Sequence, residues 1–228
     1  MNSLALPVFR SIRVVLFDLD GTLIDSAPDM GAATNRMRED RGLPALPLQS
    51  YRHRAGSGAR GMLEVAFGMA GDDPDYEAHK EEFFANYDQC LTERTRAFDG
   101  AEELVQELII RGMQWGVVTN KSTRYTVPLA RAFAIFASAA TIISGDTTAH
   151  TKPHPAPLLE AARRMGVSPA DCLYVGDDER DVIAGRAAGM GTVAANYGYL
   201  GLKTDTRTWG ADAIIDSPLA LLHCLPKA

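Results

Sequence analysis

Short runs of apolar residues recur along the chain, and each one ends abruptly in polar or glycine-containing sequence. The first run spans residues 12–17 and stops at Asp18. Similar runs occupy residues 115–118, 141–143, 173–175, 192–195 and 213–215. Continuous runs of Val, Ile and Leu at this length, without polar alternation, are typical of parallel strands buried on both faces. The pattern therefore predicts six buried strands.

Between these runs lie segments with apolar residues at helical spacing. They span residues 101–111, 122–133, 156–165 and 178–188, where apolar side chains recur at i, i+3 and i+4. Strands that alternate with helices form parallel sheets covered by helices on both faces. The sequence thus predicts an α/β fold with a doubly wound, Rossmann-like parallel sheet.

One interval breaks the alternation. Residues 29–96 contain three helical patterns, at 30–41, 59–67 and 75–92, and no convincing strand. The interval begins just after the first strand and ends where the strand and helix alternation resumes. We predict an inserted all-helical cap domain at 29–96 and a core formed by residues 1–28 and 97–228.

Composition narrows the class of protein. The chain has 228 residues, of which 46% are hydrophobic and 23% charged, and a formal net charge of -6. These are the proportions of an ordinary globular protein, and the negative charge argues against a nucleic-acid partner. Three widely spaced cysteines, no signal peptide in the opening segment and no apolar stretch of roughly 20 residues predict a cytoplasmic protein without membrane contact. We expect a monomer or homodimer.

Polar residues gather at the ends of the predicted strands and at one helix start. In an open parallel sheet, the reactive crevice lies beyond the carboxyl ends of the strands. Three or four carboxylates that converge there would repel one another unless a divalent cation neutralised them, and all-oxygen ligands favour Mg²⁺. The residues concerned are Asp18, Asp20, Gly21, Thr22, Thr119, Asn120, Lys152, Asp177, Asp178 and Asp181.

The order and spacing of these residues are specific. DLDGT at 18–22, Thr119, Lys152 with Pro153, and GDDERD at 176–181 resemble the four ordered motifs of haloacid dehalogenase-type phosphatases. The resemblance covers nearly the whole chain. It implies that Asp18 attacks phosphorus to form an aspartyl-phosphate, and that Asp20 protonates the leaving oxygen and then activates water.

The same resemblance implies the binding roles. Thr119 and Lys152 bind the phosphoryl oxygens, while Asp18, the backbone carbonyl of Asp20 and Asp177 hold Mg²⁺. Asp181 joins them directly or through water. A carboxylate attacks an anionic phosphate only when cations offset the repulsion, which suits Lys152 and Mg²⁺. Gly21 allows close approach of the backbone, and Thr22 and Asn120 add hydrogen bonds.

Other residues carry two interpretations each. Asp178 is an extra carboxylate relative to the family pattern and is explained by capping the helix, whereas Asp25 either matches an extended first motif or caps the first helix of the inserted domain. His150 and His154, beside Lys152, are better explained as loop histidines than as metal ligands. Arg60 follows a glycine-rich loop at 54–59, where it either contacts an anionic substrate group or is a surface arginine.

The expected substrate is a small phosphorylated metabolite. The position of the cap and the sequence DLDGTLIDSAPD at 18–29 resemble phosphoglycolate phosphatases, which implies hydrolysis of 2-phosphoglycolate. WGVVTNK at 115–121, YGY at 197–199 and WGAD at 209–212 resemble N-acetylmuramic acid 6-phosphate phosphatases. A β-phosphoglucomutase-like phosphotransferase and a non-catalytic phosphometabolite-binding protein are weaker alternatives.

Overall fold

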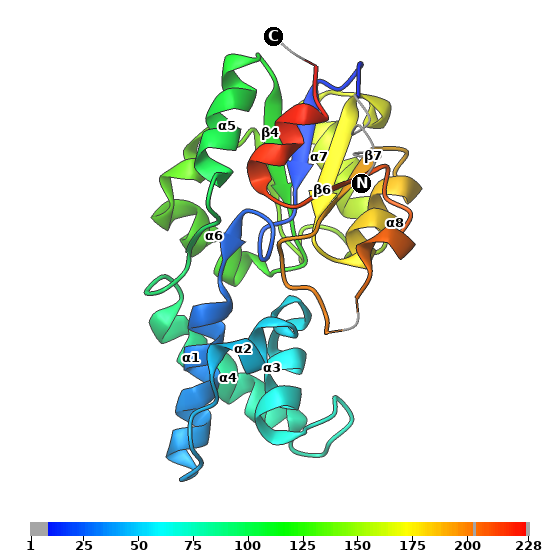
Figure 1. Cartoon of the computed structure of the whole chain (residues 1–228). Coiled ribbons are helices and arrows are strands. Elements are labelled where there is room, and N and C mark those ends of the chain that lie inside the picture. Colours follow the sequence, from blue (N-terminus) through cyan, green and yellow to red (C-terminus); the bar gives the residue numbers. More distant parts are fainter. Residues whose placement is uncertain (1–8, 203, 227–228) are drawn as a thin grey trace, which may run out of the picture.

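A parallel sheet of six strands forms the centre of the molecule (Figure 1). The computed structural model describes residues 9–202 and 204–226. The sheet order is β5-β4-β1-β6-β7-β8, and every pairing is parallel. The strands are β1 (Val14–Phe17), β4 (Gln114–Val118), β5 (Thr141–Ile143), β6 (Cys172–Gly176), β7 (Gly191–Ala195) and β8 (Ala213–Ile215). All six predicted strands are confirmed.

Helices cover both faces of this sheet, as predicted. Val15 and Phe17 of β1 belong to one hydrophobic cluster, with residues of α5 (Ala101–Ile110) and α6 (Thr123–Ala132). Val14 and Leu16 belong to a second cluster, with residues of α7 (Ala156–Met165) and α8 (Glu179–Ala187). Successive side chains of a strand point to opposite faces, so β1 is buried on both. The doubly wound α/β fold is confirmed.

The topology places a crevice at the end of β1. This strand lies between β4 and β6, so the strand order reverses on either side of it. Ligands bind outside the carboxyl ends of strands at such a switch point. Short 3-10 helices complete the connections: η1 (Ala55–Ser57), η2 (Ala134–Ser138), η3 (Pro169–Asp171), η4 (Thr206–Thr208) and η5 (Pro218–His223).

Four helices extend beyond the carboxyl end of β1, at the bottom of Figure 1. They are α1 (Ala27–Asp40), α2 (Leu48–Arg52), α3 (Gly58–Phe67) and α4 (Tyr76–Cys90). An antiparallel pair, β2 (Ile24–Asp25) and β3 (Arg96–Ala97), joins the two chain segments that lead to and from them. The sequence did not predict α2 or this pair, because five-residue and two-residue elements are too short to show periodicity.

The hydrophobic cluster on the α5 face continues into these four helices. It includes Met37 of α1, Tyr51 of α2, Leu63 of α3 and Phe83 of α4. The domain division at residues 29 and 96 stays a prediction. Within the described ranges, no helix is both long and apolar enough to span a membrane. The prediction of no signal peptide concerns mainly residues 1–8, which lie outside the described residues.

Candidate active site

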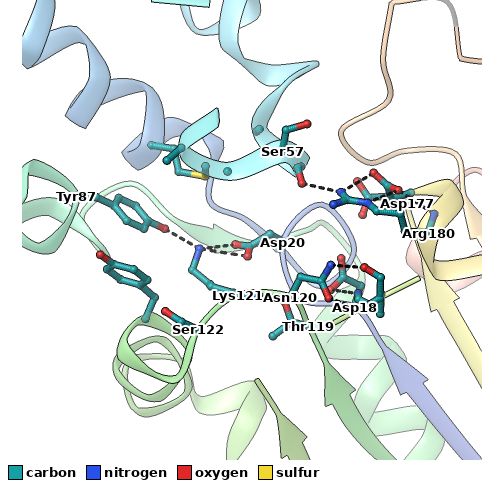
Figure 2. A pocket seen from close by; sticks show the side chains of 18 of the residues that line it. Asp18, Asp20, Ser57, Tyr87, Thr119, Asn120, Lys121, Ser122, Asp177 and Arg180 are labelled. Carbon is teal, nitrogen blue, oxygen red and sulfur yellow. Dashed lines mark hydrogen bonds and ion pairs between the residues drawn. The ribbon is translucent and has the colours of Figure 1, made fainter. Parts of the chain in front are cut away.

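A cavity of about 320 Å³ opens between the carboxyl ends of the sheet strands and the four extending helices. Figure 2 shows it from close by. Its two sides come from parts of the chain that are far apart in sequence. The core side is lined by Asp18, Asp20, Thr119, Asn120, Lys121, Lys152, Asp177 and Asp181, among others. The helical side is lined by residues 55–59 and by Met30, Phe83, Phe84 and Tyr87.

Three carboxylates converge at the core side. Asp18 follows β1, Asp177 follows β6, and Asp181 lies in the first turn of α8. One ligand oxygen from each lies within 4.8 Å of the others. All three residues are at least nine-tenths buried. The structure thus brings together three of the aspartates that the sequence placed at strand ends.

Lys152 supplies the positive charge next to these carboxylates. Its Nζ lies 2.8 Å from Asp18 Oδ1 and 2.7 Å from Asp181 Oδ1, and it donates a hydrogen bond to Tyr174 Oη at 2.7 Å. The side chain is almost wholly buried. One ammonium among three carboxylates leaves two formal negative charges without a partner.

The pKa values reflect this imbalance. Burial raises the pKa of Asp18 from 3.8 to about 6, Lys152 opposes the rise, and the charge of Asp181 adds to it. Burial, followed by the charges of Asp18 and Asp181, raises the pKa of Asp177 well above its usual value. Burial works to lower the pKa of Lys152, but Asp18 and Asp181 outweigh it and raise that pKa. The cluster of carboxylates therefore carries more negative charge than the Lys152 ammonium neutralises.

This donor set fits a divalent cation. Apart from the Lys152 ion pair, buried Asp18 Oδ1 finds no hydrogen-bond donor among the described residues. The ligands are oxygens, which Mg²⁺ prefers, and the uncompensated charge equals that of the ion. Asp18, Asp177 and Asp181 are the side chains that can hold it.

Backbone and hydroxyl groups fix Asp177 in place. Its carboxylate accepts hydrogen bonds from Thr22 Oγ1 at 3.1 Å and from the Tyr199 backbone N–H at 2.7 Å. Gly21 has φ +89°, and a Cβ there would lie 2.1 Å from Asp177 Oδ2. A Cβ at Gly198 would lie 2.3 Å from Asp177 Cβ. Both glycines permit the close approach on which the carboxylate position depends.

Thr119 and Asn120 follow β4 and lie beside Lys152. Asn120 Nδ2 donates to the Lys152 carbonyl and Asn120 Oδ1 accepts from the Lys152 N–H, both at 2.9 Å. Thr119 Oγ1 accepts from the Lys121 backbone N–H at 3.1 Å. The amide of Asn120 and the hydroxyl of Thr22 thus serve to position Lys152 and Asp177, and their predicted bonds to phosphate stay a prediction.

The sequence analysis missed the partners of Asp20. Lys121 Nζ donates to Asp20 Oδ1 at 3.1 Å, to Oδ2 at 3.2 Å and to Tyr87 Oη at 3.0 Å, as Figure 2 shows. Ser26 Oγ also donates to Asp20. Burial works to lower the pKa of Lys121, but Asp20 outweighs it and raises that pKa. The sequence TNK at 119–121 could have indicated Lys121 as a partner of Asp20, but it gave no indication of Tyr87.

Asp178 caps α8 and anchors an arginine. Its side chain accepts from the Arg180 backbone N–H at 2.9 Å, and Asp181 completes a capping box at 3.1 Å to the Asp178 N–H. The Arg180 guanidinium forks onto Asp178 and donates to the Gly56 carbonyl at 2.9 Å. The helix-cap interpretation of Asp178 is confirmed, and Arg180 connects the core to the 55–59 loop.

Several candidate residues lie away from the cavity. Arg60 is exposed, and it is not among the residues that line the cavity, so its contact with substrate stays a prediction. Asp25 forms an ion pair with Arg52 at 2.7 Å and accepts from Tyr199 Oη at 2.9 Å. The ring centroids of His150 and His154 lie 4.2 Å apart, and neither residue lines the cavity.

Comparison with known proteins places this geometry among hydrolases. Residues 12–189 match the model of the haloacid dehalogenase-like hydrolase family. The chain is 46% identical to a phosphoglycolate phosphatase of Xanthomonas campestris pv. campestris over 92% of this chain and 94% of that protein. It is 39% identical to an N-acetylmuramic acid 6-phosphate phosphatase of Pseudomonas aeruginosa, over 95% of this chain and 96% of that protein.

A solved structure agrees with these relatives. The crystal structure of a predicted phosphoglycolate phosphatase from Haemophilus somnus aligns with a TM-score of 0.80 at 27% identity. The alignment covers 93% of this chain and 97% of that one. The shared arrangement therefore spans the sheet and the four extending helices together.

Proposed function

Because the chain belongs to the haloacid dehalogenase-like hydrolases, we propose that it hydrolyses phosphomonoesters in two steps through a phosphorylated Asp18, with Mg²⁺ as cofactor. The observation that carries this proposal is the placement of Asp18 at the end of β1, 2.8 Å from Lys152 Nζ and beside Asp177 and Asp181. When bound, Mg²⁺ supplies positive charge that polarises the phosphoryl group and offsets the repulsion between two anions.

In the first step, an oxygen of Asp18 forms a bond to phosphorus while the bond from phosphorus to the leaving oxygen breaks. Asp20 delivers a proton to that oxygen, so the product leaves as a neutral alcohol. Lys152 holds positive charge beside the transferring group, and Thr119 lines the same side of the cavity. The acyl phosphate of Asp18 then remains on the protein.

In the second step, Asp20 takes a proton from a water molecule as its oxygen attacks phosphorus. The bond from phosphorus to Asp18 breaks, which releases inorganic phosphate and restores both carboxyl groups. Asp20 lines the cavity and lies two residues after Asp18, as this alternation requires. Splitting one difficult hydrolysis into two transfers allows a single carboxyl group to serve as acid and then base.

The first substrate candidate is 2-phosphoglycolate, which would give glycolate and phosphate. A relative at 46% identity bears the name phosphoglycolate phosphatase, and the cavity offers Lys121 as a cation for a small acid. The second candidate is N-acetylmuramic acid 6-phosphate, named for a relative at 39% identity. A specific observation favours it: Phe83, Phe84, Tyr87 and Tyr125 line the cavity with aromatic rings, and a two-carbon acid has little apolar surface to place against them.

We also propose the division of labour between the two parts of the chain. Residues 1–28 and 97–228 form the catalytic core, and residues 29–96 form a cap that covers the leaving group. The cavity supports this division, because its carboxylates come from the first part and residues 55–59 and α4 come from the second. An assay of inorganic phosphate release would distinguish the proposed hydrolase from a phosphotransferase or a non-catalytic binding protein.

Metal dependence tests the proposed chemistry. Phosphate release from either candidate should require added Mg²⁺ after dialysis against EDTA, and Ca²⁺ should inhibit. Ca²⁺ accepts more ligands at longer distances than Mg²⁺, so with Ca²⁺ both oxygens of Asp18 would be free to bind the ion and neither would be available to attack phosphorus. Full activity in excess EDTA, or an absence of phosphate release under every metal condition, would contradict the proposal.

A further inference from the structure

The end of the cavity opposite the carboxylates is aromatic. Tyr125 of α6 lies 5.5 Å from Phe84 and 5.3 Å from Tyr87, both of α4, measured between ring centroids. Tyr87 stacks on Phe83 at 5.8 Å. Phe83, Tyr87 and Tyr125 are at least 95% buried, so the surrounding structure holds these rings in place. Rigid rings of this kind bind the flat apolar face of a ligand at little cost in conformational entropy.

Lys121 stands at the junction between this aromatic wall and the reacting groups. Its ammonium contacts Asp20, the group that must reach the leaving oxygen, and also lies 5.0 Å from the centre of the Tyr87 ring. Figure 2 shows Lys121 and Asp20 between Tyr87 and Asp18. A leaving group that brings its oxygen to Asp20 therefore comes close to the Lys121 ammonium.

Lys121 is the lining cation best placed for an anionic leaving group. Among the described residues, the other cations that line the cavity are Lys152 and Arg180. Lys152 is held between Asp18 and Asp181, and Arg180 forks onto Asp178. Lys121, by contrast, is bound by Asp20 and a neutral tyrosine hydroxyl at 3.0 to 3.2 Å. A substrate carboxylate near Asp20 can share this ammonium.

Tyr125 adds an unsatisfied polar group to the aromatic end. Its hydroxyl is buried and has no hydrogen-bond partner in the described part of the chain, although the side chain lines the cavity. Buried hydroxyl groups are normally paired, and an unpaired one is costly. A ligand with hydroxyl or amide groups beside its ring would supply the missing partner.

The size of the cavity separates small acids from larger ones. A volume of about 320 Å³ equals that of roughly ten water molecules in the liquid. A two-carbon acid bound at Asp18 and Lys121 would leave the part of the cavity beside Phe84, Tyr87 and Tyr125 unfilled by ligand. A sugar-sized ring would fill that part and bury its own apolar face.

We propose that Lys121, Tyr87 and Tyr125 form the leaving-group subsite, and that it selects phosphomonoesters whose alcohol carries both a carboxylate and a sugar-sized ring. The proposal deepens the proposed function and rests on it. Lys121 recognises the carboxylate, and Tyr87 and Tyr125 bind the ring.

Four phosphomonoesters test the two features separately. N-acetylmuramic acid 6-phosphate and N-acetylglucosamine 6-phosphate differ by the lactyl carboxylate, while 2-phosphoglycolate and ethyl phosphate are the corresponding pair without a ring. The wild-type protein should show its highest kcat/KM on N-acetylmuramic acid 6-phosphate, at least tenfold above each of the others. A preference for 2-phosphoglycolate over the ring-bearing acid would overturn the proposal.

Variants then assign the features to residues. Lys121→Met should reduce the preference for the carboxylate at least tenfold within each pair, and Lys121→Gln provides a second variant if that one does not fold. Arg131→Ala, at an exposed position of α6 outside the cavity lining, is the matched control, and it should change the same ratios less than twofold. Equal losses on charged and uncharged substrates in both Lys121 variants, or a tenfold change with Arg131→Ala alone, would overturn the assignment.

Tyr125→Ala should reduce the preference for N-acetylglucosamine 6-phosphate over ethyl phosphate about tenfold, whereas Tyr125→Phe, which keeps the ring, should change it less than Tyr125→Ala. An unchanged ratio in Tyr125→Ala would overturn the role of the ring. Failure of the proposed function has a different signature, because then none of the four esters releases phosphate, or Asp18→Asn retains full turnover. Turnover that is lost in Asp18→Asn, with ratios unaffected by Lys121 and Tyr125, contradicts only this inference.

Discussion

The two ends of the cavity are built in different ways. At the catalytic end, Asp18 and Asp177 follow buried strands directly and Asp181 lies in the first turn of the next helix, so the sheet and the helix start set their positions. At the leaving-group end, Tyr87 on α4 and Tyr125 on α6 meet only through folding of the whole chain. The reaction class is therefore encoded in short local motifs, whereas substrate preference depends on residues that are distant in sequence.

Their electrostatics differ as well. The catalytic end has an excess of buried negative charge, which fits a divalent cation and a phosphoryl group. The leaving-group end combines one ammonium with aromatic rings. Substitutions at the first end should affect every substrate equally, and those at the second should depend on the leaving group.

Lys152 at the catalytic end and Lys121 at the leaving-group end allow the most direct comparison of the two ends. Lys152→Met should lower kcat/KM about a thousandfold on all four esters, because it removes the cation beside the developing charge and leaves Asp18 and Asp181 without their buried partner. Steady-state assays on the four substrates would measure this. A loss that varied strongly with the leaving group would contradict the separation of roles.

Gly198→Ala should disturb the carboxylate cluster although it replaces none of the carboxylates. A Cβ at this position would lie 2.3 Å from Asp177 Cβ and 2.4 Å from the Gly21 carbonyl oxygen, so Asp177 must shift. We expect the Mg²⁺ concentration for half-maximal activity to rise about tenfold to a hundredfold. Gly71→Ala is the control, since a Cβ there would meet only the Arg60 side chain, at 3.8 Å. Equal metal requirements in the two variants would refute this role of Gly198.

Arg180→Met should have a smaller effect. It removes the hydrogen bond to the Gly56 carbonyl and the fork onto Asp178, but it leaves Asp178 able to cap α8 through the backbone N–H. KM should rise about threefold to tenfold with little change in kcat, because a partly exposed contact between the core and the 55–59 loop is lost. A drop in kcat that matches Lys152→Met would place Arg180 in the chemical step instead.

The catalytic end should also affect the stability of the fold. Because the pKa of Asp18 is raised from 3.8 to about 6, the folded metal-free protein binds a proton in that range more tightly than the unfolded chain does. Stability therefore increases as pH falls from about 7 towards 4, by on the order of 2 kcal/mol from this group. Thermal unfolding in EDTA should show a higher Tm at pH 5 than at pH 7, and Asp18→Asn should reduce the difference. An equal difference in both proteins would contradict the assignment.

The sequence was sufficient for much of the fold and the catalytic end. Residues 14–17 of the first run predict a strand because both faces of β1 are buried, so each of these four residues must be apolar. The motif at Asp18 is recognisable because DLDGT follows this run directly and Thr119, Lys152 and GDDERD follow it in order. The short elements α2, β2 and β3 left no periodic signal.

The leaving-group end was not predictable in the same way. Tyr87 and Tyr125 look like ordinary core positions of amphipathic helices, and only their packing shows that they also line the cavity. Arg60 had two equal interpretations because it follows a glycine-rich loop; it is exposed, the glycines at 56 and 58 line the cavity, and its contact with substrate stays a prediction. Nearness in sequence to a loop does not determine which face of the following helix a side chain occupies.

The central claim is that Asp18 carries the phosphoryl group while Asp20 moves the proton, and mass spectrometry after rapid acid quench tests it most directly. With an activated ester whose leaving group needs little protonation, Asp20→Asn should accumulate protein heavier by one phosphoryl group, located on Asp18, and should lose it slowly. Asp18→Asn should form no such species, because its amide is not a competent nucleophile. A phosphorylated Asp18→Asn protein, or hydrolysis by Asp20→Asn at the wild-type rate, would contradict the account.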